Sequence, residues 1–83
     1  MGLFNFFFRR EVAGGEGASP ETAIAVSSVD AEYKWVQRNC PGYSFLSQSL
    51  QEINGTMYDV LELQNRQGEE RTVYFNITQF FGK

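Results

Sequence analysis

Residues 45–77 read FLSQSLQEINGTMYDVLELQNRQGEERTVYFNI. Large apolar and β-branched residues alternate with polar ones, and two turn signals interrupt them, Asn54-Gly55 and Asn65 to Gly68. Asn-Gly is the preferred pair of a two-residue type I′ hairpin, and the second segment fits a type I turn with Gly68 in the left-handed bulge position. This stretch is therefore predicted to form a meander of antiparallel strands.

The two turns also predict which side chains share a face of the sheet. The first turn places Leu46 opposite Leu63, and the second places Leu61 opposite Val73. Together they direct one set of large apolar side chains toward a core: Leu46, Leu50, Met57, Leu61, Leu63, Val73, Phe75 and Ile77. At roughly 1.5 to 3 kcal/mol for each fully buried large side chain, this set offsets much of the ordering entropy of a small domain.

The opposite face of the predicted meander carries Tyr58, Val60 and Tyr74, with Val60 directly opposite Tyr74. Phe45 is expected on this face too. Serine, glutamine, threonine and asparagine surround the three residues. Exposed strands often carry tyrosine and valine because those residues suit a pleated surface. The alternative is a contact surface covered by another protein, a second copy or the chain's own Phe-rich ends.

A helix is predicted before the meander. Ser27 to Asp30 carry a capping-box pattern, and Pro41-Gly42 ends the helix. One apolar stripe runs along it: Val29, Tyr33, Val36 and Cys40. Trp35 projects about 120° from the centre of the stripe, so it is expected to flank the core and stay partly exposed. A tryptophan at such a rim is a good interface anchor.

The segment before this helix has two interpretations. Ile24 and Val26 lie two residues apart within Thr22 to Ser27, a pattern typical of a short strand. Ser19-Pro20-Glu21 is also a good helix start, which would extend one helix from Pro20 to Asn39. We favour the strand. The predicted fold is α+β, with one helix packed on a three- to four-stranded antiparallel sheet in the order β-α-β-β-β.

The amino-terminal residues have a different composition. Residues 1–19 are predicted to form a flexible Phe-rich arm and Gly-rich linker, and residues 20–83 a single small domain. The apolar run precedes its cations and is short, so it fits neither a signal peptide nor a membrane span. It would suit a bilayer interface with anionic headgroups. The candidate membrane contacts are Leu3, Phe4, Phe6, Phe7, Phe8, Arg9 and Arg10.

The composition excludes several kinds of chemistry. The chain has no histidine, which excludes histidine-based triads and the usual histidine-containing metal sites. Its net charge of −3 disfavours nucleic acid as a partner. The single cysteine, Cys40, cannot form an internal disulfide and fits a reducing compartment, so a cytoplasmic location is expected. Asp59 and Glu62 fall on opposite faces of their strand, and no carboxylate pair is expected to support acid–base catalysis.

Two hypotheses about function follow. The first is a small non-enzymatic interaction module, without a cofactor or metal, that binds a protein partner or self-associates through the exposed sheet face. Its candidate binding residues are Tyr58, Val60, Tyr74 and Trp35. The second is a peripheral membrane adaptor anchored by the Phe-rich arm. The sequence names no partner for either.

Overall fold

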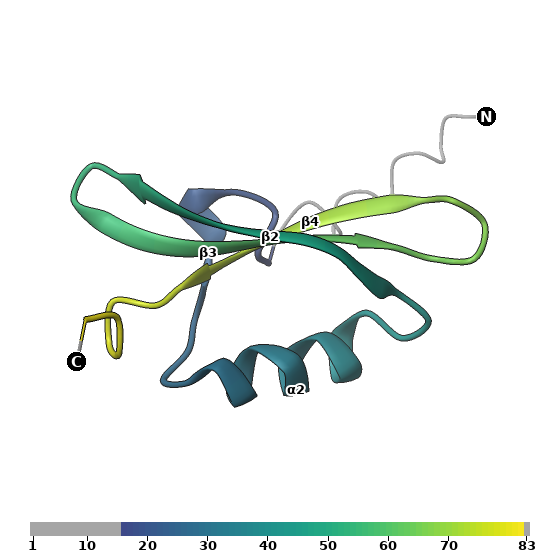
Figure 1. Ribbon diagram of the computed structural model, residues 1–83, viewed down its shortest axis with the longest axis horizontal. Helices are drawn as coiled ribbons and strands as arrows, with labels where there is room; N and C mark the ends of the chain where they lie inside the picture. Colours follow the sequence, from purple (N-terminus) through teal and green to yellow (C-terminus); the bar gives the residue numbers. More distant parts are fainter. Residues whose placement is uncertain (1–15, 83) are drawn as a thin grey trace.

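The computed structural model describes residues 16–82 as one helix layer against one sheet layer (Figure 1). One α-helix and four strands follow a short 3₁₀ turn, η1, and this combination confirms the predicted α+β class. The elements are η1 (Pro20–Thr22), β1 (Ile24–Ala25), α2 (Val29–Asn39), β2 (Ser44–Ile53), β3 (Thr56–Gln64) and β4 (Glu70–Asn76).

The sheet has the strand order β1-β4-β3-β2 and is mixed, so the prediction of a purely antiparallel sheet is wrong. β2, β3 and β4 form the antiparallel meander, whereas β1 pairs with β4 in parallel. β1 and β2 therefore run in the same direction at opposite edges of the sheet. Strands in the same direction need a crossover connection, and α2 supplies it along one face.

The segment before α2 combines features of both interpretations. The helix-start signal yields only the turn η1, in which the Ser19 backbone N–H donates to Thr22 Oγ1 at 3.3 Å. Ile24–Ala25 then pairs with β4, so the favoured strand is confirmed and the single long helix is wrong. α2 begins after Ser28, whose Oγ accepts a hydrogen bond from the Ala31 N–H at 3.1 Å.

Both predicted turns are confirmed. Asn54 and Gly55 have φ angles of 51° and 83°, the two left-handed conformations that a type I′ turn requires. At the second turn Gly68 has a φ of 86°, and its N–H donates to the Asn65 carbonyl at 3.1 Å. The Asn65 N–H in turn donates to the carbonyl of Glu69 at 3.0 Å. These turns set the predicted registers near them.

A β-bulge changes the register at the start of β2. The pairing shifts between Phe45 and Ser47, so Phe45 rather than Leu46 lies opposite Leu63. An extra residue exchanges the faces of the side chains beyond it. Phe45 consequently lies on the helix side, where its ring packs edge to face on Tyr33 with 5.1 Å between centroids. The prediction of an outward Phe45 is therefore wrong. Leu46, predicted to lie in the core, is 53% exposed, so that prediction is wrong as well.

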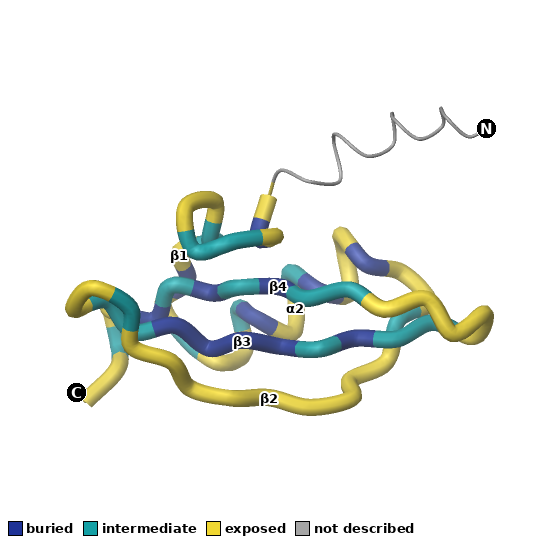
Figure 2. Tube along the Cα trace, turned by 90° about the horizontal axis from the view of Figure 1, so that it is seen from above, coloured by how far each residue is buried: buried dark blue, intermediate teal, exposed yellow. Residues whose placement is uncertain are grey.

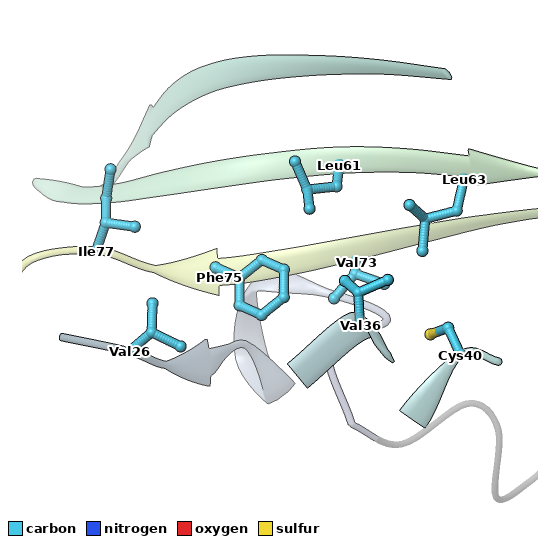
Figure 3. Packing of buried hydrophobic residues seen from close by; sticks show 8 residues of the cluster. All are labelled: Val26, Val36, Cys40, Leu61, Leu63, Val73, Phe75 and Ile77. Carbon is cyan, nitrogen blue, oxygen red and sulfur yellow. The ribbon is translucent and has the colours of Figure 1, made fainter. Parts of the chain in front are cut away.

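The core lies between α2 and the β3–β4 half of the sheet (Figure 3). It comprises Val26, Val36, Cys40, Leu61, Leu63, Val73, Phe75 and Ile77. Trp35 packs against it, edge to face on Phe75 at 5.7 Å, and stays partly exposed as predicted. Leu50 has its predicted partner, Asp59, but remains 57% exposed, so its predicted place in the core is wrong.

The helix is also rotated from its predicted orientation. Val29 and Tyr33 are exposed, whereas Glu32 is fully buried with Val36 and Cys40. The buried positions therefore follow i, i+4, i+8 from Glu32. The predicted stripe is correct only in its carboxy-terminal half, and an acidic residue occupies the core side of the first turns.

Gly17 lies within the stretch expected to be linker. Its N–H donates to the Thr22 carbonyl at 2.7 Å, and its own carbonyl accepts from the Tyr74 N–H at 2.7 Å. This buried glycine is thus attached to the edge of β4, ahead of the expected boundary at residue 20. The candidate membrane contacts, Leu3 to Arg10, lie outside the described residues.

Candidate functional site

β2 forms one edge of the sheet, and its outer side carries no strand among residues 16–82. Every residue from Ser44 to Glu52 is exposed, and only Ile53 is partly covered. Figure 2 shows this contrast as a continuous exposed trace beside the largely buried β3. β2 is therefore the most open regular element of the described chain.

Alternation along the hairpin shows which backbone groups of β2 point outward. Ile53 and Thr56 flank the two-residue turn and form a hydrogen-bonded pair, so the next pair, Glu52 and Met57, is a non-hydrogen-bonded one. The Met57 carbonyl accepts from the Ile77 N–H at 3.1 Å, which confirms that its backbone points away from β2. By the same alternation Gln48, Leu50 and Glu52 direct their N–H and C=O groups to the open side of β2.

Apolar side chains accompany this open backbone. Phe45, Leu46 and Leu50 are 49%, 53% and 57% exposed. Between α2 and the start of β2 lies an open groove of about 970 Å³. Its lining includes Tyr33, Val36, Cys40, Tyr43, Phe45 and Gln48. The open edge and the groove together form a surface, here called the β2 edge, that would suit an extended peptide.

Two carboxyl groups lie buried beneath this surface. Glu32 of α2 and Asp59 of β3 are 0% and 3% exposed. Gln48 of β2 holds Asp59, because its Nε2 donates to Asp59 Oδ2 at 2.7 Å. Sequence reasoning missed this pair. Two signals were present: Glu32 lies four residues before Val36, and Asp59 alternates with inward-facing residues of β3.

Burial raises the pKa of the Glu32 carboxyl to about 8, and the hydrogen bond and the charge of Asp59 raise it as well. Glu32 therefore keeps its proton at neutral pH. No N–H or hydroxyl group of the described residues donates to Glu32 Oε1, Glu32 Oε2 or Asp59 Oδ1. A neutral Glu32 lowers the cost of burying these unpaired oxygens. Neither carboxyl lines the groove, so we assign the pair a structural role.

Cys40 is a packed residue rather than a reactive one. Burial raises the pKa of its thiol, and the nearby Arg71 only partly opposes this effect. The side chain belongs to the core and lies at the carboxy-terminal end of α2. A thiol in this setting stays protonated and does not act as a nucleophile at neutral pH.

The structure brings the three predicted sheet-face residues together. Val60 lies opposite Tyr74, and the rings of Tyr58 and Tyr74 pack edge to face at 6.2 Å. Tyr58 and Val60 are only 8% and 2% exposed, and Tyr74 is half-buried, so this surface is less open than expected. Trp35 packs on the other face of the sheet and does not join them.

Residues 5–83 match the protein family described as Domain of unknown function (DUF4919). The chain belongs to this family. No curated protein and no solved structure shows significant similarity to it. The family description assigns no activity.

Residues 16–82 lack two further features. No group of three or more cysteine, aspartate and glutamate side chains is arranged there to hold a metal ion. No helix of that part is long and apolar enough to cross a membrane.

Proposed function

We propose that this protein is a non-enzymatic interaction module that binds an extended segment of a protein along the β2 edge. The observation that carries the proposal is the open backbone of β2, with its three outward-facing residues and three exposed apolar side chains. In this mode of recognition, main-chain hydrogen bonds supply affinity, and pockets for alternate side chains supply specificity.

The composition of β2 supports a functional edge. Proteins usually protect edge strands with lysine, proline or a very short strand, because an open edge pairs with other chains. β2 is 10 residues long and contains neither lysine nor proline. Its one charged residue is Glu52, and its one irregularity is the bulge at Phe45 to Ser47. Most of the edge is thus unprotected.

The groove supports selectivity for the bound segment. Side chains of an added strand would project alternately to the two faces of the sheet. Those on the helix side would meet Leu50 and, near the bulge, the aromatic wall formed by Tyr33 and Phe45. The chemistry of this wall favours apolar or aromatic residues in the partner. Tyr58, Val60 and Tyr74 remain a second candidate surface for the same function.

The proposal is tested by comparing the two surfaces in the full-length protein. Leu50→Pro removes a backbone donor that points to solvent, a change that edge strands tolerate, whereas Tyr74→Ser alters the other sheet face. Each variant is used to capture partners from the native cell extract, after thermal melts confirm that it folds. We expect Leu50→Pro to reduce capture at least tenfold and Tyr74→Ser to leave it unchanged. Loss with Tyr74→Ser alone would refute the β2 edge.

A further inference from the structure

We propose that the segment bound at the β2 edge is β2 of a second copy of this chain, paired antiparallel about a two-fold axis at Leu50. The inference rests on the proposed function, since it names the partner of the same surface. It follows from three features of β2: the backbone groups that face outward, the single charged residue, and the second N–H of the Gln48 side-chain amide, which does not bond Asp59.

The outward-facing residues restrict the possible registers. Backbone hydrogen bonds between two copies of β2 require Gln48, Leu50 and Glu52 of one copy to face residues of the same set in the other. An axis at Leu50 places Leu50 opposite Leu50 and Gln48 opposite Glu52. An axis at Ser49 or Gln51 would place Leu50 opposite a polar or charged side chain instead. Of these three axes, only the one at Leu50 places apolar opposite apolar and polar opposite polar. An axis at Gln48 would place Leu50 opposite Leu46, where the bulge interrupts regular pairing.

The charge pattern favours the same register. Glu52 is the one charged residue of β2, and in this register it faces an amide rather than a second carboxylate. Like charges directly opposite each other destabilise a strand pair. The Gln48 amide donates one hydrogen to Asp59, and its second N–H is available to Glu52 of the other copy. The two-fold axis produces this contact twice.

The pairing also accounts for apolar surface that α2 leaves uncovered. A two-fold axis normal to the sheet keeps the α2 helices of both copies on the same face. Leu50, 57% exposed in the single chain, then packs against its counterpart between the helices. The two four-stranded sheets become one continuous sheet, and the bare β2 edge disappears.

Disulfide trapping tests the register in the full-length chain. In a hydrogen-bonded antiparallel pair the two Cα atoms lie about 5.5 Å apart, within the range that a disulfide bridges. Leu50→Cys should therefore give a covalent dimer under mild oxidation. Leu46→Cys is the matched control, because Leu46 lies on the same strand and is nearly as exposed. In the proposed register its two introduced thiols lie about 27 Å apart, at about 3.4 Å per residue.

We expect at least tenfold more covalent dimer from Leu50→Cys than from Leu46→Cys. Both variants retain the buried Cys40, so that thiol contributes equally to each. Equal cross-linking of the two variants, or none with Leu50→Cys, would overturn the register.

Sedimentation velocity tests the association itself. The wild-type chain should form a dimer whose dissociation constant rises at least tenfold with Leu50→Lys, because two ammonium groups then face each other across the axis. Ser49→Lys, on the other face of the strand, should change it less than threefold. A wild-type chain that stays monomeric at millimolar concentration overturns the self-pairing. In that case, if Leu50→Pro still reduces the capture of another protein from the cell extract, the proposed function stands with a different partner. A dimer unaffected by Leu50→Lys overturns this pairing as well.

Discussion

The two edges of the sheet differ in how far other parts of the chain cover them. On the β4 side, β1 adds a parallel strand, the Gly17 carbonyl accepts from Tyr74, and α2 covers the face beneath. On the β2 side the sheet ends in a bare strand. A helix with its side chains is about 10 to 12 Å wide, whereas strands lie about 4.8 Å apart. One helix therefore covers about two strands, here β3 and β4, and β2 remains uncovered.

Truncating one leucine on each side should give the largest contrast. Leu61 is fully buried on central β3, whereas Leu50 is exposed on β2 and faces the same side of the sheet. Leu61→Ala should lower the free energy of unfolding by roughly 2 to 5 kcal/mol, because it leaves a cavity. Leu50→Ala should lower the free energy of unfolding by less than about 1 kcal/mol when it is measured at a concentration where the chain is monomeric. Denaturant melts measure both, and equal costs would mean that β2 is covered in solution.

The buried carboxyl pair predicts a dependence of stability on pH. The pKa of Glu32 is 4.5 when unperturbed and about 8 in the folded protein. Between these values the unfolded chain releases a proton that the folded chain keeps, so stability falls as pH rises. The penalty is absent below about pH 4.5 and complete above about pH 8. The two pKa values differ by about 3.5 (8 − 4.5), and one pKa unit corresponds to about 1.4 kcal/mol, so the full penalty is about 5 kcal/mol. Glu32→Gln should recover roughly 2 to 4 kcal/mol of it at pH 8, because a buried amide without a partner is itself costly.

The matched control for Glu32→Gln is Glu21→Gln, which removes an exposed carboxylate far from the β2 edge. Thermal or denaturant melts of both variants and the wild type are compared from pH 4 to 9. The difference in stability between Glu32→Gln and wild type should grow with pH, and it should grow more than the difference between Glu21→Gln and wild type. A flat difference for Glu32→Gln would show that this carboxyl is already ionised in the folded protein at neutral pH.

A smaller contrast tests whether the segment at Gly17 packs against β4. Gly17 and Gly42 both have a left-handed φ, of 79° and 87°, so an alanine at either costs roughly 1 to 2 kcal/mol. At Gly17 the added Cβ would also lie 2.9 Å from Val73 Cγ1, whereas at Gly42 it meets nothing within 4 Å. Gly17→Ala should therefore cost about 1 to 3 kcal/mol more than Gly42→Ala in chemical denaturation. Equal costs would mean that Gly17 is not packed against β4.

The same contrast separates what could be predicted from the sequence from what could not. The turns at Asn54-Gly55 and Asn65 to Gly68 depend on local backbone chemistry, and they gave correct registers for most of the meander. Phe45 and Leu46 could not be placed, because a bulge far from the turn shifts the register without a glycine or proline to mark it. The shift puts Phe45 opposite Leu63 and leaves Leu46 exposed. Apolar pattern alone places Leu50 in the core. Its exposure depends on how far α2 extends across the sheet, which is a tertiary property.

The missed carboxyl pair has a related cause. Binary patterning assigns glutamate to the surface, and it therefore rotated the predicted stripe of α2 toward Val29 and Tyr33. Glu32 is fully buried and lies close enough to Asp59 for Asp59 to raise its pKa, and Gln48 of β2 holds Asp59 by a hydrogen bond. The pair therefore depends on residues of three separate elements. The spacing from Glu32 to Val36 and the alternation along β3 each indicate burial of one carboxyl, but neither local pattern predicts that the two carboxyls lie together.

The weakest expected effect concerns the Phe-rich arm, residues 1–10. It tests whether the arm, rather than the β2 edge, is the surface that binds other molecules. Leu3, Phe4 and Phe6 to Phe8 precede Arg9 and Arg10, a composition expected to bind anionic bilayers weakly and reversibly. In liposome sedimentation, changing Phe6, Phe7 and Phe8 to serine should reduce the bound fraction a few-fold on anionic vesicles, with little binding of either protein to neutral ones. Leu50→Lys should leave lipid binding unchanged while weakening protein association. If the serine variant instead lost the protein association and Leu50→Lys kept it, the adhesive surface would be the arm, and the open β2 side would be ordinary exposed sheet.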